Sequence, residues 1–385
     1  MLKKVLSVTL VVALIITTFA GCAKSAPAGE TGPIKIGSIM PISGPVSAYG
    51  TQSRDAIVMA VDEINAKGGI LGRQVEVKVE DDEASPEKTK SAFTKLVTQD
   101  GVIGIVGALT SKCSLAITAD AQARKIIMIS PSSTSDNVTD AGDYIFRSCY
   151  NDSFQGQVVA TFAYNNLKAK KAAILFDNAN DYSKGLTQTF KAKFQELGGT
   201  VVAEESYATG DVDFNAQLTN IKGTKPDILF IPDYYNTVSL IAKQVKTNGI
   251  TSTMLGADGW DEIANNAGDE VVGSYYSNHY SPDANDPEVK AFVKKYTELF
   301  GVSPNALAAL AYDATYILTD AITKAGSVDS VAIKTAMMQT NKKFVTGQIS
   351  FNEKRNPIKS AVMVEIVKGA QPNKPAVKYA ATVNP

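Results

Sequence analysis

Two short loops rich in hydroxyl side chains are the stretches of this sequence best suited to bind a small anion. They read LTSKCS (109–114) and SPSSTS (130–135), and each follows an apolar run that predicts a buried strand. The helix expected after such a strand begins with unpaired backbone N–H groups and the positive end of its dipole. A ligand carboxylate placed there would also reach the hydroxyls of Ser111 and Thr134. The alternative interpretation is that these hydroxyls only cap their own helices.

Side chains suited to catalysis or metal binding are scarce. The chain has one histidine, His279, and three cysteines, and it lacks a G-x-S-x-G motif, a P-loop and a C-x-x-C pair. Asp81, Asp82 and Glu83 could hold a hard cation, but acidic residues at the end of an exposed strand are usually solvated. We therefore expect a binding protein with no enzyme activity, metal or cofactor. An exported hydrolase stays open as a different class.

The elements that would position the two loops alternate between strand and helix. Apolar runs such as 34–40 and 102–109 predict strands, whereas the apolar spacing within 53–69 predicts a helix. The same order begins again at the strand-like run 172–177. This order predicts an α/β fold of two doubly wound parallel-sheet domains with a ligand cleft between them. Ligands bind beyond the carboxyl ends of the strands in such sheets, where both hydroxyl loops are expected.

The last hundred residues contain too few elements for a third domain. We expect them to complete both sheets, so that the chain crosses between the domains near 149–151, 278–282 and 347–351. Several connections side by side would act together as a hinge. The predicted first lobe is 34–149 plus 281–348, and the predicted second lobe is 150–280 plus 349–385.

The first 21 residues predict an export signal. Lys3 and Lys4 precede an apolar run that is shorter than the roughly 20 residues a membrane-spanning helix needs. The run ends in FAGC, which resembles a bacterial lipobox and implies that Cys22 receives a lipid. The alternative is a plain signal peptide with a free thiol. Residues 22–33 are small, polar and contain Pro and Gly, which predicts a flexible tether.

The net charge and the length of the chain limit which partners and how many domains we expect. Removal of the first 21 of the 385 residues, with their two lysines, would leave 364 residues carrying 36 basic and 39 acidic side chains. These charges are interspersed, which argues against a nucleic-acid partner, and the length favours two domains. We expect a monomer outside the cytoplasm, anchored by its lipid to the bacterial cell membrane.

Six ordered motifs are GSIMPISGPVSAYG, GGILGRQVEV, GIVGALTS, IIMISPSSTS, PDILFIPDYYN and MLGADGW. Together they resemble the type I extracytoplasmic (periplasmic) solute-binding proteins of ABC transporters, within the branched-chain amino-acid (Leu/Ile/Val) binding protein family. The resemblance covers about residues 34–367. It implies a two-lobed receptor that closes on a branched-chain or related amino acid and delivers it to membrane permease subunits.

The resemblance also implies roles for single residues. By position, Ser111 would bind the ligand's carboxylate, and the family's strand-end pair of one backbone carbonyl and one threonine falls on Ser132 and Thr134. Asp258 would meet the ligand's ammonium, where the family commonly has a longer glutamate. A ligand without an amino group, such as an aromatic or aliphatic carboxylate or a small amide, is the alternative, and so is a sensor lipoprotein that passes no solute on.

Aromatic walls of the site are implied at Tyr49, Tyr182 and Tyr234, with Tyr235 as the alternative to Tyr234. Trp260 could cover the side-chain pocket or could be a packing residue. The disulfide of the family's first domain falls here on Ser85 and Thr110, so it is absent. Cys113 and Cys149 could pair instead.

Overall fold

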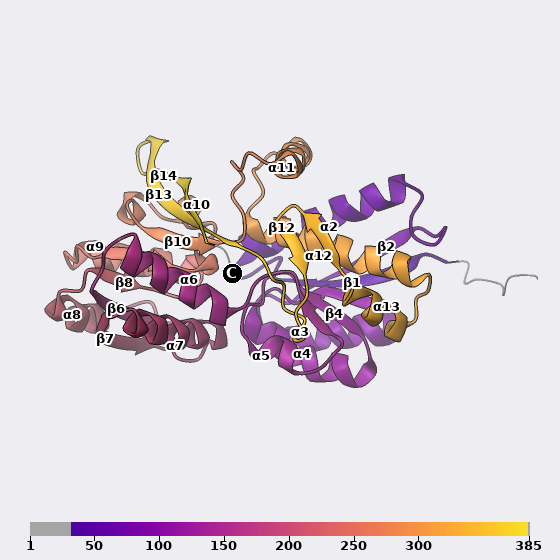
Figure 1. Cartoon of the computed structure of the whole chain (residues 1–385), viewed down its shortest axis with the longest axis horizontal. Helices are drawn as coiled ribbons and strands as arrows, with labels where there is room; N and C mark the ends of the chain where they lie inside the picture. Colours follow the sequence, from indigo (N-terminus) through magenta and orange to yellow (C-terminus); the bar gives the residue numbers. More distant parts are fainter. Residues whose placement is uncertain (1–31, 384–385) are drawn as a thin grey trace, which may run out of the picture. The chain divides into compact units, whose positions relative to one another are not determined.

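The computed structural model describes residues 32–383, so the predicted signal peptide, Cys22 and most of the predicted tether lie outside the described residues. Two large sheets organise the described chain (Figure 1). One sheet has five parallel strands in the order β2-β1-β3-β4-β5, and the other has seven strands in the order β14-β13-β10-β9-β8-β6-β7. We call the five-stranded sheet with its helices the first lobe, and the seven-stranded sheet with its helices the second lobe.

Strands of the first lobe are β1 (Ile34–Met40), β2 (Val75–Asp81), β3 (Gly104–Gly107), β4 (Ile127–Ser130) and β5 (Ile145–Arg147). Strands of the second lobe are β6 (Lys171–Asp177), β7 (Thr200–Tyr207), β8 (Ile228–Phe230), β9 (Thr253–Gly256), β10 (Tyr275–Asn278), β13 (Ala361–Gln371) and β14 (Lys374–Val383). In this second sheet β13 and β14 are antiparallel to their neighbours and the rest are parallel. The predicted α/β fold with two wound sheets is thus confirmed, with an antiparallel edge added to the second.

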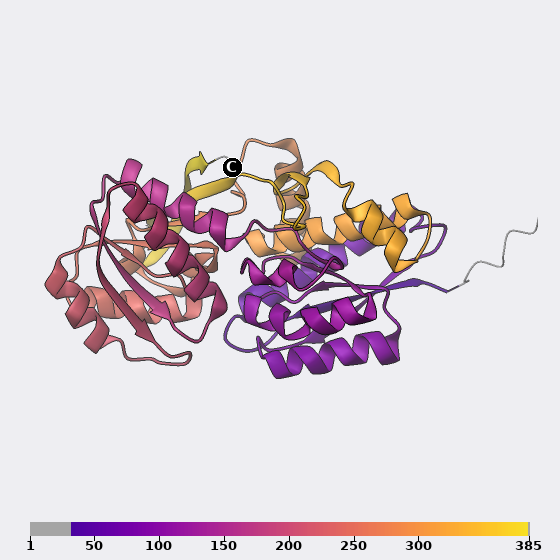
Figure 2. The same ribbon diagram turned by 60° about the horizontal axis from the view of Figure 1, so that its bottom comes forward.

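Helices cover both faces of each sheet, as Figure 2 shows for the first lobe. The first lobe has α2 (Ser47–Ala66), α3 (Pro86–Lys95), η1 (Leu96–Asp100), α4 (Ser111–Arg124), α5 (Asn137–Asp140), α11 (Pro287–Phe300), α12 (Ala306–Ala325) and α13 (Ser330–Met337). The second lobe has α6 (Asp152–Asn165), α7 (Asp181–Glu196), α8 (Asn215–Thr224), α9 (Tyr235–Thr247), η2 (Asp258–Trp260), α10 (Ile263–Asn266) and η3 (Asp269–Val271). Because helices pack on both faces, the central strands β3, β4, β8 and β9 are almost entirely buried and mostly apolar.

Three connections join the lobes. The chain passes from β5 to α6 through residues 148–151, from β10 to α11 through 279–286, and from the hairpin β11 (Asn341–Phe344)–β12 (Gly347–Ser350) to β13 through 351–360. We call these three segments the hinge. The expectation that C-terminal strands complete both sheets is wrong for the first sheet, because β11 and β12 pair only with each other. The predicted boundary between residues 348 and 349 falls inside β12, and we propose that the second lobe resumes after Ser350.

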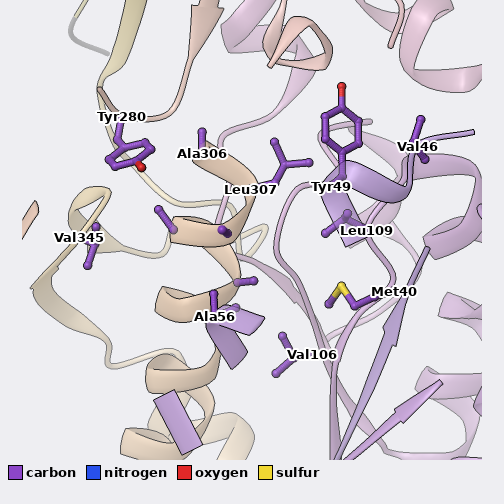
Figure 3. Close-up of a cluster of buried hydrophobic side chains, with 14 of the residues drawn as sticks. Met40, Val46, Tyr49, Ala56, Val106, Leu109, Tyr280, Ala306, Leu307 and Val345 are labelled. Carbon is purple, nitrogen blue, oxygen red and sulfur yellow. The ribbon is translucent and has the colours of Figure 1, made fainter. Parts of the chain in front are cut away.

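Buried apolar side chains reach to the edge of the first lobe that faces the second. Met40, Val106 and Leu109 belong to this cluster, and Tyr49 stands beside them on the first turn of α2. Figure 3 shows the Tyr49 hydroxyl directed away from Met40 and Leu109. The ring therefore packs on the first lobe while its polar end is free to bond across the lobe boundary.

Cys113 and Cys149 are both buried free thiols, so the disulfide considered from the sequence is not formed. Burial raises the pKa of each thiol to about 12, which keeps both protonated and poorly reactive at neutral pH. Within residues 32–383, no helix has both the length and the apolar character needed to cross a membrane.

Candidate functional site

A small cavity lies where the lobes meet, at the carboxyl ends of strands from both sheets. Its volume of about 20 Å³ is close to what a single water molecule requires. An amino acid is much larger, so its entry requires the lobes to separate or the wall residues to move. The lining residues are Tyr49, Leu109, Thr110, Ser111, Ser132 and Leu307 from the first lobe, and Tyr182, Tyr234, Asp258 and Gly259 from the second.

Most of the residues that the sequence analysis singles out meet at this cavity. Tyr49, Ser111, Ser132, Tyr182, Tyr234 and Asp258 all line it, whereas Thr134 and Trp260 do not. Of the two adjacent tyrosines, Tyr234 is the one on the wall. Tyr235 instead accepts a hydrogen bond on its hydroxyl from the backbone N–H of Ala48, at 3.4 Å.

The hydroxyls of the two first-lobe loops bind the loops to each other and cap no helix. Thr110 is the N-cap residue of α4 but makes no side-chain cap hydrogen bond. Ser111 Oγ accepts a hydrogen bond from the backbone N–H of Ser135 at 3.2 Å, and Ser132 Oγ donates to the Leu109 carbonyl at 2.8 Å. The capping interpretation is therefore wrong here. The first-turn N–H groups of α4 stay available at the cavity edge, which suits an anion.

A buried arginine that the sequence analysis does not single out holds the loop 130–135 in place. Arg147, at the end of β5, is fully buried. Its guanidinium donates to the Ser133 carbonyl and to the Ser135 carbonyl, both at 2.8 Å. These bonds fix the loop that Ser111 contacts, so Arg147 positions the first-lobe wall of the cavity without lining it.

Asp258 supplies the negative charge on the second-lobe wall. It follows β9, is only 4% exposed, and its Oδ1 accepts hydrogen bonds from the Tyr182 hydroxyl at 2.8 Å and the Gln155 amide at 3.0 Å. Its Oδ2 lies 2.9 Å from Nε2 of His279. The Tyr182 hydroxyl in turn accepts from the backbone N–H of Gly259 at 2.8 Å. Neither Gln155 nor His279 is among the predicted site residues.

Three tyrosine rings close the cavity. Tyr182 and Tyr234 are stacked with centroids 5.2 Å apart, and Tyr49 meets the edge of Tyr234 at 6.3 Å. The Tyr49 hydroxyl donates to the Gly259 carbonyl at 2.5 Å, which joins the two lobes directly. Burial raises the pKa of all three phenols, so they act as neutral donors at physiological pH.

Further hydrogen bonds join the lobes beside the cavity, where the start of α12 meets the segment after η2. The backbone N–H of Ala306 donates to Asp261 Oδ2 at 2.6 Å. Glu262 Oε1 accepts from the side-chain amides of Asn305 at 2.9 Å and of Gln52 at 2.7 Å. Burial raises the pKa of Asp261 to about 7, so this contact includes a carboxyl that titrates near neutral pH.

A second buried carboxyl, Asp152, lies close to the cavity at the start of α6 and is also missing from the predicted set. It is fully buried, and neither oxygen has a well-formed hydrogen bond among the described residues, although the Thr134 hydroxyl lies beside it. Burial raises its pKa well above the usual value, and the charge of Asp258 adds to the effect. The raised pKa favours the neutral, protonated form of Asp152, which leaves Asp258 as the carboxylate that faces the cavity.

The sequence interpretation of Trp260 as a cover of the ligand pocket is wrong. The indole is fully buried, and its Nε1 donates to the Ile231 carbonyl at 2.8 Å. In the short 3₁₀ helix η2, Asp258 faces the cavity while Trp260 packs into the second lobe. Its ring lies so close to β9 that a Cβ atom on Gly256 would be 2.2 Å from a ring carbon.

This contact predicts a large stability difference between two glycine substitutions. Gly256→Ala should lower the free energy of unfolding by about 3 kcal/mol, because the buried ring has no space to move away. Gly223→Ala, in α8, adds a Cβ atom that would meet no other atom within 4 Å, so it should be neutral or stabilising by up to about 1 kcal/mol. Urea unfolding curves of the two variants test this. Equal stability would contradict the packing role of Trp260.

Comparison of the sequence with known proteins identifies the family of this chain. Residues 33–371 match the model of the periplasmic binding protein family. The Leu/Ile/Val-binding protein BraC3 of Rhizobium johnstonii is 32% identical over 324 residues, which cover 83% of this chain and 88% of that protein.

Two solved structures are similar over nearly their whole length. The leucine binding protein LivK from Thermotoga maritima has a TM-score of 0.86 and 36% identity, covering 91% of this chain and 99% of that chain. The branched-chain amino acid transporter substrate binding protein LivJ from Streptococcus pneumoniae, solved with isoleucine, has a TM-score of 0.83 and 35% identity, covering 90% of this chain and 100% of that chain. This chain therefore belongs to the type I periplasmic binding protein family, in the group that includes the Leu/Ile/Val-binding proteins.

Proposed function

We propose that this protein is the extracytoplasmic substrate-binding protein of an ABC importer, and that it captures a branched-chain or related zwitterionic amino acid between its lobes. The observation that carries the proposal is that Ser111 and Asp258 line one cavity from opposite lobes. One wall offers hydroxyl and N–H donors, and the other offers a buried carboxylate. An amino acid carries a carboxylate, which the donors of the first wall can bind, and an ammonium, which the carboxylate of the second wall can bind.

In this proposal the ligand's carboxylate lies at the start of α4, against Ser111 and the unpaired first-turn N–H groups. Its ammonium meets Asp258, and the apolar side chain lies against Leu109, Leu307 and the tyrosine rings. A ligand that touches both lobes stabilises the arrangement in which they are closed. Opening about the three hinge connections would admit and release it.

Delivery and anchoring form the other half of the proposal. A lipid on Cys22 would hold the protein at the bacterial membrane surface, where a permease could take the ligand from the closed lobes. We also propose a monomer without catalytic activity. In support, His279 is hydrogen-bonded to Asp258 and is absent from the cavity wall, so it is not placed as a base for a serine there.

A ligand without an amino group is the second candidate. One observation favours it: Asp258 already accepts hydrogen bonds from Tyr182 and Gln155 and faces His279, so its carboxylate is satisfied without an ammonium. An aromatic or aliphatic carboxylate, or a small amide, would use the Ser111 wall alone. A sensor lipoprotein with the same site is a further alternative, which a transport assay would distinguish.

A thermal-shift titration separates these candidates. L-leucine, L-isoleucine or L-valine at a hundred times its dissociation constant should stabilise the folded protein by about 2.7 kcal/mol. The matched controls are 4-methylpentanoate and 3-methylbutylamine, which are leucine without its amino group and without its carboxyl group. Both should give much smaller shifts at the same concentration. A shift with 4-methylpentanoate but none with leucine would favour the second candidate, and no shift with any of them would contradict both.

A further inference from the structure

His279 lies behind the carboxylate proposed to bind the ligand's ammonium. It is the first residue after β10, in the hinge connection 279–286, and its side chain is fully buried. Its Nε2 is 2.9 Å from Asp258 Oδ2, and its ring stacks on Tyr150 of the connection 148–151 with centroids 3.9 Å apart. His279 does not line the cavity. It therefore contacts Asp258 from the hinge side, opposite to where a ligand would bind.

We propose that His279 is a positioning residue for ammonium binding: as a neutral imidazole it holds Asp258 toward the cavity, and its protonation weakens the binding of an amino acid. This inference rests on the proposed function. A neutral imidazole carries one N–H, and the carboxylate at 2.9 Å places it on Nε2, because a carboxylate only accepts. Nδ1 has no hydrogen-bond partner among the described residues, in agreement with this assignment.

The charges around the ring decide its protonation state. Three titratable side chains face it: Asp258 after β9, Tyr150 in the first connection, and Lys359 in the connection 351–360. Burial lowers the pKa of His279, Lys359 lowers it further, and Asp258 acts in the opposite direction. The lowered pKa keeps the imidazole neutral at physiological pH and leaves the full negative charge of Asp258 for the ligand.

Protonation of His279 would remove the negative charge that Asp258 offers to the ligand. An imidazolium at Nε2 would form an ion pair with Asp258, and the ligand's ammonium would then approach a carboxylate that is already neutralised. Affinity for an amino acid should therefore fall as the pH falls through the pKa of His279, by about tenfold or more for charges this close. By linkage, bound ligand should lower the pKa of His279 by a corresponding amount.

Two substitutions and calorimetry of the purified protein with L-leucine test the inference. His279→Gln keeps a neutral N–H donor near the position of Nε2, so its affinity at pH 7.5 should stay within about threefold of the wild type. It should also lose the fall in affinity that the wild type shows as the pH drops through the pKa of the His279 ring, which the ring ¹⁵N shifts locate. His279→Phe keeps a ring to stack on Tyr150 but no donor, so affinity at pH 7.5 should fall about tenfold, as for a lost hydrogen bond to a charged group. Melting temperatures of both variants confirm that they fold.

The pH dependence of the wild type must be compared with that of His279→Gln, because Asp261, with its pKa of about 7, also titrates near neutral pH and could change the affinity. A wild-type pH dependence that persists unchanged in His279→Gln would overturn the inference, and so would wild-type affinity in His279→Phe. Because the chain has one histidine, its ring ¹⁵N shifts are readily assigned, and a charged imidazole at pH 7.5 would also overturn it. Failure of the wild type to bind leucine, isoleucine and valine would instead contradict the proposed function, and the inference with it.

Discussion

Asp258→Asn should weaken the binding of L-leucine at least about a hundredfold. The substitution keeps the size of the side chain but removes the charge, so the ligand's ammonium would be buried against a neutral amide. Breaking a buried ion pair by removing one partner costs about 3–5 kcal/mol, and each 1.4 kcal/mol is a factor of about ten in affinity. Isothermal titration calorimetry at pH 7.5 measures the change directly.

Asp120→Asn is the matched control, since it makes the same chemical change on an exposed part of α4. Leucine affinity of this control should stay within about twofold of the wild type, as for most surface substitutions. Unchanged leucine affinity in Asp258→Asn would remove Asp258 from the ammonium site. Tighter binding of 4-methylpentanoate than of leucine by the wild type would instead support a ligand that lacks an amino group.

Arg147→Met should lower the free energy of unfolding by about 3 kcal/mol or more, because it leaves the buried carbonyls of Ser133 and Ser135 without their donors. Each unpaired buried acceptor costs about 1–3 kcal/mol, and methionine can donate to neither. The loop 130–135 would also lose its support, so we expect weaker leucine binding in the fraction that folds. Urea unfolding followed by calorimetry measures both effects.

Arg124→Met, at the exposed end of α4, is the control for this change. Its stability should stay within about 0.5 kcal/mol of the wild type. A loss below about 1 kcal/mol in Arg147→Met would show that water or a neighbouring side chain replaces the guanidinium. That result would contradict the positioning role of Arg147.

Local patterns were sufficient to predict the two wound sheets and the hydroxyl loops. The spacing of apolar residues is set within each strand or helix, and Ser111 lies shortly after the end of β3. Asp258 was inferred from the family resemblance, since a single acidic residue after a strand has no local signal of its own. The residues that surround Asp258 were missed for the same reason. Gln155 lies 103 residues away from it in sequence, so only the folded chain brings the two together.

Two errors have a common physical origin. Trp260 lies two residues after Asp258, and the side chain directions in the three-residue η2 follow neither the helical nor the strand period. The sequence of β12 likewise does not say which strand it pairs with, and its actual partner is β11. Periodicity indicates which residues are buried together, while pairing partners and the orientation of short turns depend on contacts distant in sequence.

The central claim is that one amino acid bridges the two walls of the cavity, and a crystal structure of the protein grown with L-leucine tests it most directly. We predict that the ligand's carboxylate lies at the start of α4, within hydrogen-bond distance of Ser111, and that its ammonium lies within hydrogen-bond distance of Asp258. Leucine bound in the opposite orientation, or at any place other than between Ser111 and Asp258, would contradict the account.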